Sequence, residues 1–167
     1  MRLLTSTDYA LRVLMRLSAE PDAHLSTDAL ARELVISRNH LHKIVHFLTE
    51  AGLVRTIRGA RGGVMLARPA SKIKVGEVIR SREEDQALVE CFRRNGGACT
   101  LLPRCRLRGM LDDAKNAFYR HLDRYTLADC LTGFCLSANE NSIRKQSRSE
   151  RSARRRPLPR AKSSERH

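Results

Sequence analysis

A segment with three thiols is the part of this sequence best suited to chemistry. Cys91, Cys99 and Cys105 are spaced C-x7-C-x5-C among glycines and a proline. These residues interrupt helical and strand periodicity, so we expect a loop over residues 88–108. Buried structural cysteines usually lie on apolar periodic faces, whereas these three have Arg, Asn, Gly and Thr as neighbours. A metal centre, a disulfide or a reactive redox thiol could order such a loop.

The surroundings of the three cysteines favour a metal over a disulfide. Five arginines flank the thiols and favour the thiolate form, which is the form that binds metals. The first residues lack the apolar core of a signal peptide, and no apolar run is long enough to span a membrane. We therefore expect a cytoplasmic protein with no membrane partner, in a compartment where disulfides are rare. The spacing alone does not distinguish zinc from an iron–sulfur cluster.

The charge of the chain points to a polyanionic partner. Its 167 residues carry a formal charge of +14 and a pI near 10.6, which suits nucleic acid, although a basic solvated surface has the same composition. Residues 139–167 hold ten Lys and Arg against three Glu and almost no apolar side chains. We expect a basic, disordered tail over residues 136–167, which could add phosphate attraction or be dispensable.

The elements that would position the loop begin with a helix predicted over residues 5–19. A threonine, Thr5 or Thr7, can cap its start, and Asp8 and Arg12 are spaced to pair on its outer side. The buried face predicted by helical spacing consists of Leu11, Leu14, Met15 and Ser18.

Two further helices are predicted over residues 27–34 and 38–50, with Ser26 and Ser37 as caps and Gly52 after the second. A very short turn joins them, which is typical of a helix-turn-helix. The inner face of the second helix is predicted to be Leu41, Ile44, Val45 and Leu48. Its outer face offers Arg38, Asn39, His40, His42 and Lys43 as DNA contacts, although a plain solvated face would look the same.

A hairpin with a basic tip is predicted directly after these helices. Strands over residues 53–58 and 64–67 flank a glycine-rich turn with Arg58 and Arg61. A hairpin in this place is typical of a wing, and its arginines can grip phosphates or enter a minor groove. Helix-turn-helix and wing together predict binding to double-stranded DNA.

The C-terminal half is predicted to supply the dimer contact. A short helix over residues 75–82 leads to the loop, and a long amphipathic helix follows it. An unpaired apolar stripe needs a partner, and DNA-reading dimers bind two half-sites, so we expect a homodimer. The stripe consists of Leu107, Met110, Leu111, Ala114, Phe118, His121, Leu122 and Tyr125. A short helix over residues 126–135 holds Cys130, which fits core packing, and Cys135, which could be a free thiol.

These motifs together resemble the winged-helix iron–sulfur regulators of bacteria. The resemblance covers about residues 1–132 and rests on residues 7–12, 37–41, 58–63, 66–69 and the three-cysteine loop. Within that family the nitric-oxide-sensing repressors are the most similar. The narrower match rests on residues 88–92, 103–107 and 122–129.

The resemblance implies a cluster, with [4Fe–4S] favoured over [2Fe–2S], held by Cys91, Cys99 and Cys105. Some members have a histidine three residues after the last cysteine, where this chain has Arg108. In the nitric-oxide-sensing members an aspartate from the partner's first helix supplies an oxygen ligand, and Asp8 stands at the matching place. A surface aspartate paired with Arg12 is the alternative for Asp8.

The expected protein is a repressor. Its dimer is expected to bind operator DNA when it carries the iron–sulfur cluster and to be released from the DNA by nitric oxide. An iron-availability regulator of the same family, or a winged-helix regulator with a structural zinc site, are the alternatives. An enzyme is not expected, because no acid–base pair, nucleophile constellation or phosphate-binding loop is recognisable.

The expected fold is mainly α, with a winged helix-turn-helix, a small hairpin wing and a long dimerisation helix. The expected divisions are a DNA-binding domain over 1–70, a connecting helix and cysteine loop over 71–106, a dimerisation region over 107–135 and the tail over 136–167.

Overall fold

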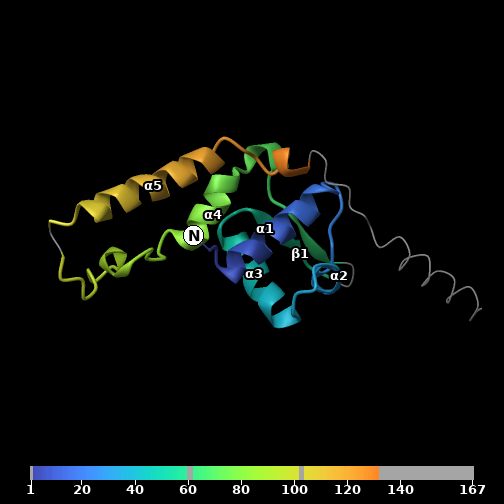
Figure 1. Ribbon diagram of the computed structural model, residues 1–167. Coiled ribbons are helices and arrows are strands. Elements are labelled where there is room, and N and C mark those ends of the chain that lie inside the picture. Colours follow the sequence, from blue (N-terminus) through green and yellow to red (C-terminus); the bar gives the residue numbers. More distant parts are fainter. Residues whose placement is uncertain (1, 60–61, 102–103, 132–167) are drawn as a thin grey trace, which may run out of the picture. The chain divides into compact units, whose positions relative to one another are not determined.

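Helices dominate the described part of the chain, residues 2–59, 62–101 and 104–131 of the computed structural model (Figure 1). Arg61, Cys135 and the predicted tail lie outside these residues. The helices are α1 (Thr5–Ser18), α2 (Thr27–Glu33), α3 (Arg38–Glu50), α4 (Val75–Glu83) and α5 (Arg106–Leu122). Strands β1 (Val54–Ile57) and β2 (Gly63–Leu66) form a hairpin. Single 3-10 turns are η1 (Ala70–Lys72), η2 (Glu90–Phe92) and η3 (Asp129–Leu131). The predicted fold class is confirmed.

The helix-turn-helix forms as the sequence indicates. The Ser26 hydroxyl accepts a hydrogen bond from the Ala29 amide at 3.1 Å, and the Ser37 hydroxyl accepts one from the His40 amide at 3.4 Å. Each bond satisfies an amide that the first turn of its helix leaves free. The predicted inner face of α3 is confirmed, because Leu41, Ile44, Val45 and Leu48 are all buried.

Helix α1 differs from the prediction in both its cap and its buried face. Leu4 occupies the cap position without a side-chain bond, and Thr7 is fully buried, so neither threonine caps the helix. Leu14 and Ser18 of the predicted face are buried, whereas Leu11 and Met15 are only half-buried, and Ala10, Val13 and Leu17 complete the core face. The core face is therefore broader than the predicted one, because α1 packs against α3, α4 and β2.

The hairpin is the predicted wing, and a third segment braces it. Strands β1 and β2 pair antiparallel, with Val54 opposite Leu66 and Ile57 opposite Gly63. Leu25, which lies before α2, exchanges two backbone hydrogen bonds with Val64 at 2.8 and 3.0 Å. A Cβ on Gly63 would lie 2.7 Å from the Leu25 carbonyl oxygen, so this close approach requires glycine.

Helix α4 lies between α1 and α5 (Figure 1). The chain after α5 is tied to the start of α4, because the Val75 amide donates to the Tyr125 carbonyl at 3.0 Å. The Leu127 amide donates to the Ile73 carbonyl at 2.9 Å, and Leu127 is fully buried in the main core. Among the described residues, none of the helices is both long and apolar enough to span a bilayer.

The apolar stripe of α5 is partly covered at one end only. Phe118 and Leu122 are half-buried against a small core of Val75 and Ile79 of α4 and Tyr119 of α5. Leu107 and Met110, in its first turns, are 58% and 59% exposed. This end of the stripe therefore has the unpaired apolar surface that the sequence led us to expect.

Candidate functional site

The outer face of α3 carries five polar side chains that project from the protein. Each is exposed, and the set is Arg38, Asn39, His40, His42 and Lys43. The guanidinium of Arg38 lies 3.0 Å from the Asp28 carboxylate of α2, which orients it beside the turn. The His40 ring lies 6.3 Å from the Tyr9 ring of α1. Sharing one helix face is what reading a major groove requires, and DNA contact by these residues stays a prediction.

The wing presents Arg58 at the end of β1, and this side chain is exposed. Gly59 follows with φ +113°, a backbone conformation open to glycine, and it lets the tip turn sharply. Arg61, the other predicted contact of the wing, lies outside the described residues.

The cysteine segment is a loop that folds back on itself at Glu90. The Ala98 amide donates to the Glu90 carboxylate at 3.4 Å, and a Cβ on Gly97 would lie 2.3 Å from the Glu90 carbonyl oxygen. Gly97 also has φ +61°, so both its conformation and its space require glycine. Because Cys91 follows Glu90 and Cys99 follows Ala98, the turn brings the segments bearing these two thiols together.

The three cysteines are free thiols and differ in exposure. Cys91 is 6% exposed, although the sequence places it in a loop and not on an apolar periodic face. It is buried within the loop, in η2, rather than on an apolar helix face. Cys99 and Cys105 are half-buried, and Cys105 is the residue immediately before α5.

The donor chemistry of this loop fits an iron–sulfur cluster. Such clusters are held by cysteine thiolates, and three free thiols lie on this one segment. No group of three Cys, His, Asp or Glu side chains converges on one metal-ion position within the described ranges. In a [4Fe–4S] cluster each protein ligand binds a different iron atom, so its ligands need not converge on one metal-ion position.

Contacts from both ends of the loop join it to its neighbouring helices. The Arg108 guanidinium in the first turn of α5 lies 5.6 Å from the centre of the Phe92 ring in η2. The Arg94 guanidinium pairs with the Asp85 carboxylate at 2.5 Å, just after α4. The position that holds a histidine in some similar regulators therefore holds an arginine that stacks on the loop.

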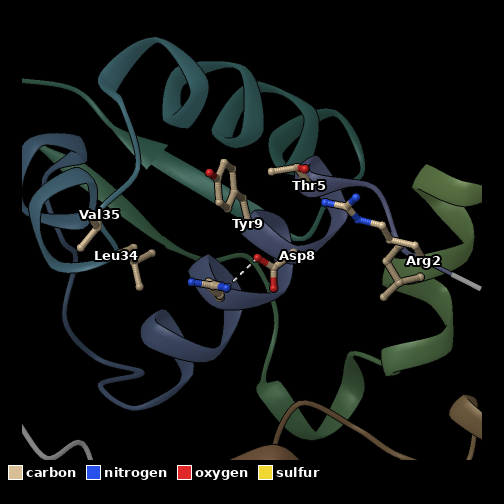
Figure 2. A pocket seen from close by; sticks show the side chains of 8 residues that line it. Arg2, Thr5, Asp8, Tyr9, Leu34 and Val35 are labelled. Carbon is tan, nitrogen blue, oxygen red and sulfur yellow. Dashed lines mark ion pairs between the residues drawn. The ribbon is translucent and has the colours of Figure 1, made fainter.

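A groove of about 570 Å³ opens beside Asp8 (Figure 2). The Asp8 carboxylate pairs with the Arg12 guanidinium at 2.8 Å, as the sequence predicts, and its side chain remains 46% exposed. Tyr9 of α1 and Leu34 and Val35 of the helix-turn-helix line the same groove. Asp8 is thus an accessible oxygen donor beside the helix-turn-helix, and its role as a ligand stays a prediction.

Cys130 packs in the small core between α4 and α5. Its side chain packs against the buried hydrophobic residues Val75, Ile79 and Tyr119. Burial raises the pKa of its thiol, with a further rise from the Asp129 carboxylate, so the neutral thiol is favoured. This environment suits the expected core role.

The fold and the loop define a class: a winged helix-turn-helix protein that carries a three-thiol loop between its DNA-binding helices and a long helix with exposed apolar residues. The chain matches the Rrf2 family, described as iron-dependent transcriptional regulator, over residues 3–133. It therefore belongs to that family of transcriptional regulators, which act by binding DNA.

Relatives and solved structures agree with this assignment. The chain is 46% identical over 132 residues to the HTH-type transcriptional regulator NsrR of Geobacillus kaustophilus, which covers 78% of this chain and 90% of the relative. It is 43% identical over 130 residues to NsrR of Bacillus subtilis, covering 77% and 89%. The IscR structure of T. potens has a TM-score of 0.63 at 27% identity, covering 80% and 88%. The cysteine regulator CymR of B. subtilis has a TM-score of 0.66 at 26% identity, covering 81% and 99%.

Sequence reasoning missed two buried polar residues near this site. Glu83 at the end of α4 is 4% exposed, and Tyr119 of α5 is 4% exposed. Glu83 has no sequence signal of burial, because its partners Leu4 and Thr7 are distant along the chain. The one available hint for Tyr119 was its place one residue after Phe118, on the edge of the apolar stripe.

Proposed function

We propose that this protein is a transcriptional repressor that senses nitric oxide through an iron–sulfur cluster. Cys91, Cys99 and Cys105 of one subunit would hold the cluster, with [4Fe–4S] favoured over [2Fe–2S]. The observation that carries the proposal is the loop itself, with three free thiols, no disulfide among them and fixed ends at α4 and α5. When bound, the cluster supplies iron that reacts with nitric oxide.

The chain's own residues support a second role for the loop, which is to set the position of the DNA-binding helices. The ion pair of Arg94 with Asp85 and the contact of Arg108 with Phe92 tie the loop to α4 and α5. An ordered loop would hold α5 in one orientation, and α5 would set the spacing of two recognition helices in a dimer. A disordered loop would release that spacing.

The exposed stripe of α5 supports a homodimer. Leu107 and Met110 leave more than half of their surface in solvent, and a second copy of α5 would cover them. In such a dimer, Asp8 of one subunit would supply the fourth ligand to the cluster of the other. The groove beside Asp8 supports this assignment because it leaves the carboxylate accessible.

The DNA contacts in this proposal are the outer face of α3 and the wing. Asn39 and Lys43 would read base edges or phosphates, and Arg58 and Arg61 would grip the backbone next to the site. A change from mostly bound to mostly free operator requires the two states to differ by on the order of 5 kcal/mol in DNA affinity. If the spacing of the two α3 helices no longer matches the two half-sites of the operator, base and phosphate contacts are lost together, and this loss can supply much of the difference in affinity.

The test uses anaerobically purified full-length protein and a duplex selected by it from a random-sequence library. Visible absorption, iron and sulfide content, and DNA retention before and after nitric oxide are measured. Cys99→Ala should lose the cluster and the retention, whereas Cys130→Ala, outside the loop, should keep both. A colourless zinc protein, or a Cys99→Ala protein with unchanged DNA binding and nitric oxide response, contradicts the proposal.

The role of Asp8 has its own test. Asp8→Ala should change the stability of the cluster and its rate of reaction with nitric oxide, whereas Asp22→Ala, an exposed acid remote from the groove, should not. Identical spectra and rates for Asp8→Ala and wild type rule Asp8 out as a ligand.

An iron-availability regulator is the second candidate, and the family description as iron-dependent favours it. It would use the same three cysteines. Titration of the loaded protein with nitric oxide and, separately, with an iron chelator separates the two functions. Release of DNA by chelator at concentrations where nitric oxide has no effect would favour iron as the signal.

A further inference from the structure

The last turn of α4 holds one buried carboxylate, Glu83. It contacts Leu4 and Thr7 at the start of α1, which are 79 and 76 residues earlier in the sequence. The Thr7 hydroxyl donates to its Oε1 at 2.5 Å, and the Leu4 amide donates to the same oxygen at 2.8 Å. Glu83 is 4% exposed and Thr7 is fully buried. Burying an acidic side chain is unfavourable unless hydrogen bonds compensate for its lost water, so this contact is specific.

Glu83 accepts a hydrogen bond at the N-terminus of α1, where the sequence of α1 provides no capping side chain. The cap residue of α1 is Leu4, which has no side-chain acceptor to offer the first-turn amides. The Glu83 carboxylate, from another helix, instead accepts from the amide of Leu4 itself and from the Thr7 hydroxyl, and negative charge is also favoured at a helix N-terminus. The position of the first turn of α1 therefore depends on where α4 ends.

The two other long side chains of this turn contact other helices. The Arg82 guanidinium lies 4.4 Å from the centre of the Phe47 ring, which belongs to the recognition helix α3. The Arg80 guanidinium lies 2.6 Å from the Asp123 carboxylate after α5 and 5.1 Å from the centre of the Tyr119 ring. Residues 80–83 thus contact α1, α3 and α5 from a single turn.

The cysteine loop leaves from this same turn. Glu84, the next residue, accepts a hydrogen bond at its carbonyl from the Lys115 ammonium of α5 at 3.2 Å. Asp85 then pairs with Arg94 inside the loop. A rearrangement of the loop would therefore move the end of α4. Glu83 at that end contacts Thr7 of α1, the residue before Asp8.

We propose that Glu83 is a positioning residue that couples the state of the cysteine loop to the DNA-binding helices. This rests on the proposed function of the loop as a cluster site. With the loop ordered, the end of α4 holds Glu83 against Leu4 and Thr7 and holds Arg82 against Phe47, which fixes α1 and α3 relative to α5. When the loop loses its order, the end of α4 frays, and the positions of α1 and α3 relative to α5 are no longer fixed.

The experiment measures the ratio of DNA affinities between the cluster-loaded and cluster-free protein, using the selected duplex. In Glu83→Ala this ratio should fall by about tenfold, while visible absorption and the rate of reaction with nitric oxide stay as in wild type. Glu83→Gln keeps an oxygen that can accept both hydrogen bonds and should retain most of the ratio. Glu84→Gln changes the exposed neighbour and should behave as wild type.

A second variant covers the chance that Glu83→Ala does not fold. Thr7→Val has nearly the same shape and removes only the hydroxyl donor, and it should lower the same ratio. Hydrogen exchange of residues 4–8 should rise on cluster loss in wild type, and it should already be high in both variants.

A wild-type ratio near one would refute the proposed function and this coupling with it. A large wild-type ratio that persists in Glu83→Ala or, where that protein does not fold, in Thr7→Val would overturn the coupling alone. A merely structural Glu83 would lower both affinities equally and leave the ratio unchanged, which also overturns it.

Discussion

Val35, in the turn of the helix-turn-helix, should be stabilised by replacement with glycine. Its φ is +55°, the left-handed region, and it is the only non-glycine residue there in the described part of the chain. A β-branched side chain is unfavourable in this region because its Cβ substituents crowd the following backbone. The side chain is 88% exposed, so it contributes almost no burial in return.

The size of the effect follows from two opposing contributions. An L-residue in the left-handed region costs about 1–2 kcal/mol. Glycine loses more conformational entropy on folding than other residues, which returns about 0.5–1 kcal/mol of that gain. The difference is about 0–1.5 kcal/mol, so Val35→Gly should raise the free energy of unfolding by about 0.8 kcal/mol, the middle of that range, and raise Tm by about 2–3 °C.

The assay is urea unfolding followed by far-UV circular dichroism, with thermal scans in the same buffer. Val35→Ala is the matched control, because it keeps a Cβ and therefore most of the strain, and it should stay within about 0.5 kcal/mol of wild type. If Val35→Gly is no more stable than wild type while Val35→Ala is unchanged, the strain assigned to this turn is wrong.

Three further substitutions test other parts of the structure. Ser37→Ala removes the cap of α3 and should lower the free energy of unfolding by about 1 kcal/mol, while Ser37→Asp restores it; equal urea midpoints would contradict the cap. Met110→Asp places a charge on the exposed stripe of α5 and should turn the dimer into a monomer in sedimentation, so a persistent dimer contradicts that interface. The Tyr119 hydroxyl is buried without a hydrogen-bond partner among the described residues, so Tyr119→Phe should gain about 1 kcal/mol. Burial and the Glu83 carboxylate raise the pKa of the Tyr119 phenol, so the unfolded chain ionises at lower pH than the folded protein, and the free energy of unfolding is unaffected below about pH 10 and falls as pH rises through the raised value. Wild type should then lose more stability than Tyr119→Phe in urea titrations above about pH 10, and parallel losses would contradict this.

The parts of the fold that the sequence predicts are those set by local rules. The caps Ser26 and Ser37 and the inner face of α3 follow from a single apolar stripe with a serine before it. The Asp8–Arg12 pair follows from helical spacing, and the wing follows from glycines between two strands. Each of these depends on residues a few positions apart.

The parts that escaped prediction depend on distant partners. In helix α1, packing against α3 and α4 decides which apolar side chains are buried, whereas helical spacing alone predicted a face that included the half-buried Leu11 and Met15. Glu83 looks like a solvated charge until Leu4 and Thr7 are placed beside it. Cys91 lies in a segment rich in arginine and glycine, yet it is buried where the loop folds back at Glu90.

The candidate site was therefore recognisable by its residue types but not by its arrangement. Three cysteines in a glycine-rich segment indicate a cluster site, and spacing does not say how the loop is tied to the helices around it. The contacts of Arg108 with Phe92 and of Arg94 with Asp85 required the structure.

The most direct test of the central proposal is the dissociation constant of one selected duplex, measured by anaerobic fluorescence anisotropy for the loaded dimer and for the same protein after cluster removal. We predict that the loaded dimer binds at least about 100-fold more tightly at one fixed salt concentration. Equal dissociation constants for the two forms would contradict a repressor controlled by its cysteine loop.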